Sequence, residues 1–397
     1  MKQPQQQKQQ TLVGADQIPY FETSCGTHYQ IGYEIGNHFK DRIQRMLYNQ
    51  SLPFQQVILP FSKKAPEIVE NLRKLNSLYF PEYFEEIRGI ADGANLPTEW
   101  IFLLNVGVEL ENYATGPSGK GDKQCSDVFV SLKNFRTRTA ILGHNEDADP
   151  YTQDYDYLVK SCIKTNDQAE PFVFVAYHYA GQLPGNAFAW TKYLALSTNA
   201  QFPLVLPKAG YGLGRNFVNR KVYESKTIAQ VTETLSKFSG MLASGFASNV
   251  APLYDTQSSA LYEMRSFENA PRVNNSIAMS MHSILPFNVL SSSGQSFYFH
   301  VNMYRNLSVP EFLDPSSVHR TARFNQFTKI ETEEQVLALL GDTYDKEFPI
   351  YRQPTKTDDA STVATVLFNL ITRKVTVYNK NPKTSQPIHH FNWLTRQ

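Results

Sequence analysis

The feature that most constrains the fold is a change in the spacing of apolar residues at positions 114–124. Before it, in residues 28–113, apolar side chains recur at the spacing of amphipathic helices. After it, β-branched and aromatic residues alternate with others at period two, as in strands. The segment between, ATGPSGKGDKQ, contains glycine, proline, serine and charges but no large apolar residue, so we expect an exposed loop there.

Helices occupy most of the first segment. Residues 1–15 are polar and of low complexity, which predicts a disordered tail. One of the helices opens with proline and acidic residues and closes near Gly93, as helix starts and stops do. The predicted helices span residues 27–47, 66–80, 81–94 and 97–113.

Strands interrupted by helices fill the rest of the chain. This order predicts two sheets stacked between helical layers, an α+β architecture. The predicted helical stretches are 214–238, 316–330 and 333–341. The predicted strands are 126–133, 138–144, 156–164, 171–178, 192–199, 246–254, 259–267, 275–283, 296–303, 361–370 and 373–379.

Composition narrows the class of partner. Hydrophobic residues make up 41% of the 397 residues, which is ample for a packed core. The formal charge is +1, from 38 basic and 37 acidic residues, and no basic block stands out, so a nucleic-acid partner is not favoured. We expect a small-molecule substrate.

Location and metal content are predicted from absences. No run of about 18 apolar residues suggests a membrane span, and no apolar stretch of signal-peptide length opens the chain. The three cysteines, Cys25, Cys125 and Cys162, lack metal-site spacing and cannot all pair with one another. A reduced, cytoplasmic protein without metal or cofactor is the resulting expectation.

Cys125 is the candidate nucleophile, at the start of the first strand after the loop, in KGDKQCSDVFVSLKN. A cysteine is more often a buried apolar residue, but a place beside a solvated loop suits core filling poorly. A thiol attacks well only when a group takes its proton or lowers its pKa. Self-cleavage between Gln124 and Cys125, by thiol attack on the preceding carbonyl, would free an α-amine with an ordinary pKa of about 8 as that base. This is the layout of an N-terminal-nucleophile (Ntn) hydrolase.

A second polar cluster, GHNEDAD, follows about 20 residues later. It is typical of a polar hairpin tip. In a catalytic interpretation, Asp147 holds and orients the α-ammonium of Cys125, as a buried carboxylate orients a catalytic base. The sequence gives no basis for choosing among His144, Asn145 and Glu146 as further catalytic residues.

Acyl transfer also needs donors aimed at the developing oxyanion. Asn249 in ASGFASNVAPLYD and Asn199 in LALSTNAQF lie in small-residue strands where an amide could point into a cleft. Each is also typical of a turn or strand-end asparagine. Arg320, near the start of a helix in DPSSVHRTARF, is typical of a surface cation on residue pattern alone.

These segments together resemble the penicillin acyltransferase-like Ntn hydrolases, over about residues 26–383. The resemblance rests on many segments in the family's order, no one of them decisive. They are GTHYQIGYEIG, YFPEYFEEIRGIADGA, QCSDVFVSLKN, AILGHNEDA, YHYAGQLPGNAF, LALSTNA, LGRNFVNRKVYES, FASNVAPLYD, FHVNMY, SSVHRTARF, ATVLFNL and VYNKNP.

The resemblance implies a four-layer αββα fold of two antiparallel sheets between helical layers. It implies one structural domain, with 16–124 as an α-chain or pro-segment and 125–397 as a β-chain, hence an α/β heterodimer after self-cleavage, and it leaves a higher oligomer open. It implies an amidohydrolase of small N-acyl amines, with β-alanyl conjugates as first choice. The implied catalytic residues are Cys125, Asp147, Asn249 and Arg320, and the implied substrate-binding residues are Asn199, His300 and Asn302.

One departure from the family pattern leaves alternatives open. The family usually has glycine before the nucleophile, where this chain has Gln124, and glycine eases the strained peptide geometry that self-cleavage requires. An uncut chain would be a binding protein without catalysis. An acyltransferase would share every catalytic residue, and a cysteine enzyme with a histidine base would need one of the nine histidines near Cys125.

Overall fold

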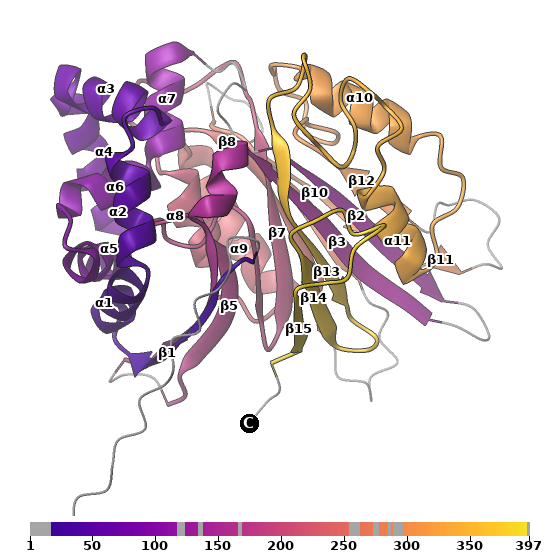
Figure 1. Ribbon diagram of the computed structural model, residues 1–397. Helices are drawn as coiled ribbons and strands as arrows, with labels where there is room; N and C mark the ends of the chain where they lie inside the picture. Colours follow the sequence, from indigo (N-terminus) through magenta and orange to yellow (C-terminus); the bar gives the residue numbers. More distant parts are fainter. Residues whose placement is uncertain are drawn as a thin grey trace, which may run out of the picture.

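Two sheets lie face to face between two layers of helices (Figure 1). The computed structural model describes residues 17–116, 124–133, 138–165, 169–253, 263–272, 278–284, 287–288 and 297–394. The expected tail and most of the expected loop, residues 117–123, lie outside the described residues. The predicted αββα architecture is confirmed.

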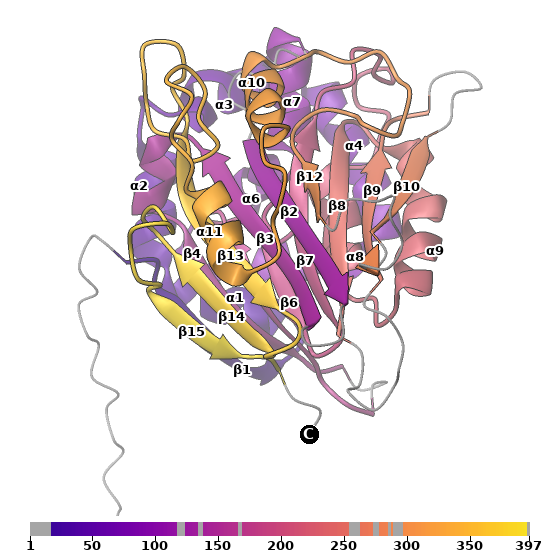
Figure 2. The same ribbon diagram turned by 90° about the vertical axis from the view of Figure 1, so that its right-hand side faces the viewer.

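Helices α1 to α9 pack on the first sheet, and α10 and α11 pack on the second (Figures 1 and 2). The α-helices are α1 His28–His38, α2 Lys40–Tyr48, α3 Leu59–Lys64, α4 Pro66–Tyr79, α5 Pro81–Ala94, α6 Thr98–Asn105, α7 Gly107–Thr115, α8 Arg215–Val222, α9 Ile228–Phe238, α10 Pro315–Phe324 and α11 Glu333–Leu340. Short helical turns are η1 Phe54–Ile58, η2 Pro150–Asp154 and η3 Ser239–Met241.

The first sheet has eight strands in the order β1-β4-β5-β6-β7-β8-β9-β10, and the second has the path β11-β2-β3-β13-β14-β15 with β12 also on β2. Among described residues, all pairs are antiparallel except β1–β4 and β11–β2. The strands are β1 Tyr20–Gly26, β2 Gln124–Lys133, β3 Arg138–Ala148, β4 Tyr157–Ile163, β5 Phe172–His178, β6 Phe188–Thr191, β7 Leu194–Gln201, β8 Gly245–Pro252, β9 Met264–Asn269, β10 Met279–Ile284, β11 Phe287–Asn288, β12 Phe297–His300, β13 Ser361–Asn369, β14 Lys374–Tyr378 and β15 His389–Asn392.

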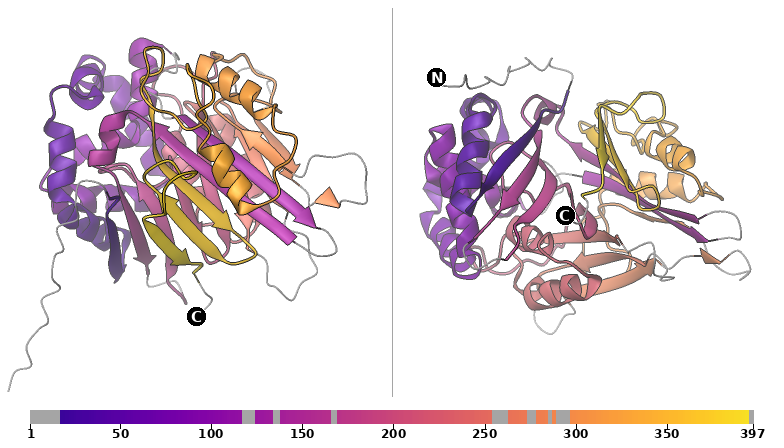
Figure 3. Two further views of the ribbon diagram at one scale, coloured as in Figure 1. Left: turned by 45° about the vertical axis from the view of Figure 1, so that its right-hand side comes forward. Right: turned by 90° about the horizontal axis from the view of Figure 1, so that it is seen from below.

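The view from below shows the layers of helices and strands side by side (Figure 3), and three apolar cores lie between them. The largest lies between the first sheet and its helices, and a second lies between the sheets and includes Phe129 of β2 and Phe188 of β6. The third lies under α10 and α11 and takes Val128 and Val130 of β2. Successive β2 residues therefore face opposite cores, as the strand pleat requires.

Three predicted helices are each two helices. The predicted helix 27–47 breaks at Phe39, whose backbone torsions are not helical (φ −101°, ψ 17°). The ring of Phe39 stacks on Tyr157 with ring centroids 3.7 Å apart. Residues 97–113 break at Val106, and residues 214–238 break before Thr227, whose side chain caps α9 by accepting from the Gln230 amide. These breaks arise from tertiary packing and capping, which apolar periodicity does not report.

The expectation of three reduced cysteines was wrong, because Cys25 of β1 and Cys162 of β4 form a disulfide. Cys125 is the free cysteine. The disulfide reinforces the β1–β4 pairing, which the sequence did not predict, since β1 is half-exposed and lacks a clean alternation. In the described part of the chain, no helix is long and apolar enough to cross a membrane.

Candidate active site

Cys125 is the second residue of β2 and is only 1% exposed. The pleat turns Cys125 and Asp127 toward the first sheet, together with Phe129, and turns Gln124 and Ser126 toward α10. The thiol thus lies between the two sheets, although its position beside the loop predicted an exposed strand end.

On this inner face, Cys125 lies opposite Glu146 of β3, and Asp127 lies opposite His144. The Cys125 thiol donates to Glu146 Oε2 at 3.7 Å. His144 bridges the two carboxylates, with Nε2 2.9 Å from Glu146 Oε2 and Nδ1 3.0 Å from Asp127 Oδ1. Tyr179 donates its hydroxyl to Glu146 Oε1. All five members of this cross-strand cluster are buried.

The charges of the cluster control the thiol. Burial lowers the pKa of His144, but Asp127 and Glu146 outweigh it and raise that pKa well above its ordinary value. Burial, and then the Glu146 carboxylate, raises the pKa of Cys125 to about 12, although His144 lowers it. The thiol is therefore protonated at neutral pH in the uncut chain. His144 is the histidine near Cys125 that a histidine-base mechanism requires, but as an imidazolium it is a donor and not a base.

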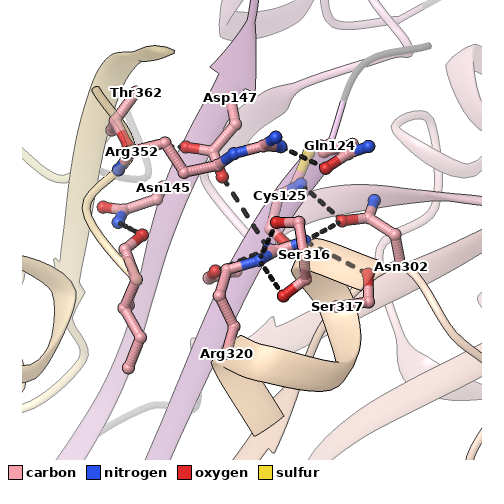
Figure 4. A network of polar contacts seen from close by, with 12 residues as sticks. Gln124, Cys125, Asn145, Asp147, Asn302, Ser316, Ser317, Arg320, Arg352 and Thr362 are labelled. Atoms are coloured by element: carbon pink, nitrogen blue, oxygen red, sulfur yellow. Dashed lines mark hydrogen bonds and ion pairs between the residues drawn. The ribbon is translucent and has the colours of Figure 1, made fainter. Parts of the chain in front are cut away.

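On the outer face, Arg320 of α10 holds the backbone of Cys125, the candidate nucleophile (Figure 4). Its Nη1 donates to the carbonyl oxygen of Cys125 at 2.6 Å and to Ser126 Oγ at 2.9 Å. Its Nη2 donates to Asn302 Oδ1 at 2.9 Å, and the same oxygen accepts from the Cys125 amide at 2.9 Å. Arg320 is fully buried, so its interpretation as a surface cation was wrong, and Asn302 contacts the nucleophile directly.

Asp147 lies on this outer face beside Arg320. Its Oδ1 accepts from Thr362 Oγ1 at 2.6 Å, whereas its buried Oδ2 accepts no hydrogen bond and lies 3.7 Å from Arg320 Nη1. Burial raises the pKa of Asp147 to about 6, although Arg352 and Arg320 both lower it. One carboxylate oxygen is thus buried in an ion pair with Arg320 but accepts no hydrogen bond, which leaves it incompletely compensated.

The Gln124 side chain is bound at both ends. Its Oε1 accepts from Arg352, and its Nε2 donates to Asp314 Oδ1 at 3.2 Å. Arg352 also donates from Nε to Asp358 Oδ2 at 2.8 Å. The residue before the nucleophile is therefore anchored, where the family's glycine would have no side chain to anchor.

The remaining predicted residues form a chain that leads away from the thiol. Asn199 Nδ2 donates to Asp127 Oδ2 at 2.7 Å, and Asn249 Nδ2 donates to Asn199 Oδ1 at 2.6 Å. His300 Nδ1 lies 3.1 Å from the same Asn199 oxygen. Asn249 thus reaches Cys125 through Asn199, Asp127 and His144, and its role as an oxyanion donor stays a prediction.

The interpretation of GHNEDAD as a hairpin tip was wrong, because Gly143–Ala148 are buried residues of β3. The polar side chains tolerate burial because they bond one another across the two strands. Sequence reasoning left Glu146 and His144 unranked and missed Asp127, Tyr179 and Arg352. The strand alternation from Cys125, combined with an antiparallel register, could have placed Glu146, His144 and Asp127 on one face with the thiol.

Cys125, His144 and Glu146 also have ligand atoms within 4.8 Å of one another, as a metal ion would need. Thiol, imidazole and carboxylate are ligands that zinc accepts. Both ring nitrogens of His144 already face carboxylates, however, so a metal would displace a hydrogen bond.

Comparison with known proteins assigns this chain to a family. The chain is 26% identical over 378 residues to β-alanyl-dopamine/carcinine hydrolase of Drosophila melanogaster, covering 91% of this chain and 93% of that one. A solved structure of a mutant conjugated bile acid hydrolase from Clostridium perfringens is similar with a TM-score of 0.32 and 9% identity, over 69% of this chain and 99% of that one. Residues 135–384 match the family model of acyl-coenzyme A:6-aminopenicillanic acid acyl-transferase. The chain belongs to this family of Ntn-type enzymes, which hydrolyse or transfer the acyl group of N-acyl amines.

Proposed function

We propose that the protein cleaves itself between Gln124 and Cys125 and then hydrolyses small N-acyl amines, β-alanyl conjugates first. The observation that carries this proposal is the buried, donor-free Oδ2 of Asp147 on the same face as Arg320 and the backbone contacts of Cys125. The name of the similar Drosophila enzyme supports the choice of acyl group.

Maturation begins with the Cys125 thiol, whose hydrogen points to Glu146. The sulfur attacks the carbonyl carbon of Gln124, the peptide C–N bond breaks, and a thioester links Gln124 to the sulfur. Water then hydrolyses the thioester, which leaves a carboxylate on Gln124 and an α-amino group on Cys125. The new ammonium supplies the donor that Asp147 Oδ2 lacks.

Turnover uses the same sulfur. The α-amine takes the thiol proton, and the thiolate attacks the amide carbonyl of the substrate. Asn249 and a backbone N–H stabilise the oxyanion, the α-ammonium protonates the departing amine, and water hydrolyses the thioester to release the acid. Asp147 keeps the α-amine oriented, while Asn302 and Arg320 hold the backbone beside it.

Intact mass and a reducing denaturing gel of the wild type beside Cys125→Ala test the proposal. Scaling the 45.2 kDa mass by residue count, cleavage gives pieces of about 14 and about 31 kDa. We expect the wild type to split before Cys125 and to hydrolyse a β-alanyl amine, and Cys125→Ala to stay whole and inactive. Full activity in Cys125→Ala would overturn the mechanism.

A second function is favoured by the anchored side chain of Gln124. Arg352 and Asp314 hold it in the uncut chain, which opposes the backbone movement that self-cleavage needs. An uncut protein would be a binding protein on the same fold. Gln124→Gly separates the two, because it removes both anchors and should speed cleavage if Gln124 is the barrier. An acyltransferase would differ only in the acceptor, so product analysis with added amine distinguishes it from a hydrolase.

The cytoplasmic location also stays a prediction. Disulfides persist mainly in oxidising environments, so the Cys25–Cys162 bond weighs against it.

A further inference from the structure

A pocket of about 100 Å³ opens on the far side of Tyr179 from the cross-strand cluster. It shares Tyr179 with the cross-strand cluster, since that hydroxyl donates to Glu146. Ala148, two residues beyond Glu146 on the same face of β3, also lines it. The pocket therefore reaches β3 two residues beyond Glu146, and Tyr179 connects its lining to the Glu146 carboxylate.

The lining of this pocket is largely apolar, and it also includes aromatic rings and carboxylates. Tyr151, Tyr155 and Tyr179 contribute rings, and Glu111, Asp149 and Asp156 contribute carboxylates. The carboxylates lie close enough to Tyr151 that, after burial, they raise the pKa of its hydroxyl. Aromatic faces together with carboxylates are the surroundings that organic cations prefer.

The cluster beside the thiol carries an excess negative charge. Glu146 and Asp127 are both buried, and the imidazolium of His144 between them compensates one of the two carboxylates. A buried charge without a counter-ion is costly. The cluster thus has room, electrostatically, for one cation.

We propose that Glu146 binds the ammonium group of a short ω-amino-acyl substrate, and so selects β-alanyl over uncharged acyl groups. This inference rests on the proposed function. In a β-alanyl group, the nitrogen lies about 4 Å from the carbonyl carbon when the chain is extended. Glu146 Oε2 lies 3.7 Å from the sulfur that attacks that carbon, so one carboxylate reaches the ammonium while the carbonyl meets the thiol.

The same contact activates the nucleophile. The Glu146 charge is, after burial, the main cause that raises the pKa of the Cys125 thiol. An ammonium beside Glu146 neutralises that charge, so the bound substrate lowers the thiol's pKa and favours the thiolate. An uncharged acyl group leaves the charge in place. Selection should therefore appear in kcat as well as in KM.

The test compares β-alanyl-dopamine with butanoyl-dopamine, in which a methyl group replaces the ammonium. We expect the wild type to prefer the β-alanyl amide in kcat/KM by about 100-fold or more, as for a charged hydrogen bond lost from a buried site. Glu146→Gln should reduce this ratio to below about 5-fold. Glu67→Gln is the matched control, because it makes the same exchange at an exposed carboxylate of α4 outside the site, and its ratio should remain that of the wild type.

Each outcome decides a separate point. Equal kcat/KM for the two amides in the wild type would overturn the inference, even if Glu146→Gln fails to fold. A Glu146→Gln enzyme that slows both amides equally would make Glu146 a positioning residue and would also overturn it. A wild type that hydrolyses neither amide would remove the proposed function itself. Alkylation by iodoacetamide adds an independent readout, because Glu146→Gln should shift thiol reactivity to lower pH.

Discussion

At the scale of single residues, Asp147 combines a functional position with a cost to folding. Its Oδ2 is buried without a hydrogen-bond donor, and burial raises the pKa of the side chain from 3.8 to about 6. The unfolded chain therefore gives up this proton at lower pH than the folded chain does. Between pH 4 and 6, ionisation of Asp147 should consequently destabilise the uncut protein.

We expect Asp147→Asn to remove this pH-dependent loss of stability. In a Cys125→Ala background, which keeps the chain uncut, the parent should lose about 2 kcal/mol of unfolding free energy relative to Asp147→Asn as pH rises from 4 to 7. Denaturant unfolding at each pH measures the difference, with exposed Asp41→Asn as control. Parallel pH profiles for the two proteins would contradict the account. In the cleavable chain, the same substitution should nevertheless slow turnover, since it removes the partner of the α-amine.

The sequence predicted the residues that touch the nucleophile's backbone better than those that touch its sulfur. Arg320 and Asn302 came from the family resemblance, and the structure places both at the Cys125 amide and carbonyl. Glu146 and His144 were left unranked because polar side chains near a turn look alike in sequence. Only the β2–β3 register shows which of them share a face with the thiol.

At the scale of elements, the crossing of α1 and α5 depends on four glycines. Gly32 and Gly36 of α1 face Gly89 and Gly93 of α5, and the two backbones touch. A Cβ at Gly32 would overlap the carbonyl oxygen of Glu86, and one at Gly89 would overlap that of Tyr29. Because the obstacle is backbone, no rotamer change relieves it.

Gly32→Ala and Gly89→Ala should each cost about 3 kcal/mol of unfolding free energy, as overpacking does. Gly240→Ala is the control, since its new Cβ would lie 3.4 Å from Arg272 Nε, an ordinary contact. Thermal unfolding of the three variants gives the comparison. A Gly89→Ala protein as stable as Gly240→Ala would show that the helices can separate at little cost.

Elements with strong local signals were predicted well, and those set by distant contacts were not. Helices α4, α5 and α11 lie where the apolar spacing of the sequence predicted them, and so do the terminal strands β13 and β14. Strands β1, β6, β11 and β15 and helix α3 were missed, and β3 was predicted to end at residue 144 rather than Ala148. In β3 the polar residues after 144 suggested a turn, but their buried hydrogen bonds keep them in the strand.

At the scale of the whole molecule, the segment before Cys125 cannot be a detachable leader. It supplies α1 to α7, which cover one face of the first sheet, and β1, which extends that sheet at its edge (Figure 1). Cleavage at Gln124 would divide the chain but leave this core intact, so the two pieces should remain one folded unit.

The disulfide allows a test of whether the two pieces remain one folded unit. Cys25 lies before the proposed cleavage bond and Cys162 lies after it, so the disulfide ties the two pieces covalently. On a non-reducing denaturing gel, the cleaved wild type should run as one species near 45.2 kDa, and reductant should resolve pieces of about 14 and about 31 kDa. Cys162→Ser should show both pieces without reductant. The cleaved Cys162→Ser protein should still elute as a complex under native conditions. In the uncut chain, loss of the disulfide should lower the free energy of unfolding by about 2–5 kcal/mol. Two pieces from the wild type on a non-reducing gel would mean that the disulfide does not form in solution, whereas one intact species on both gels would mean that Gln124–Cys125 is not cut.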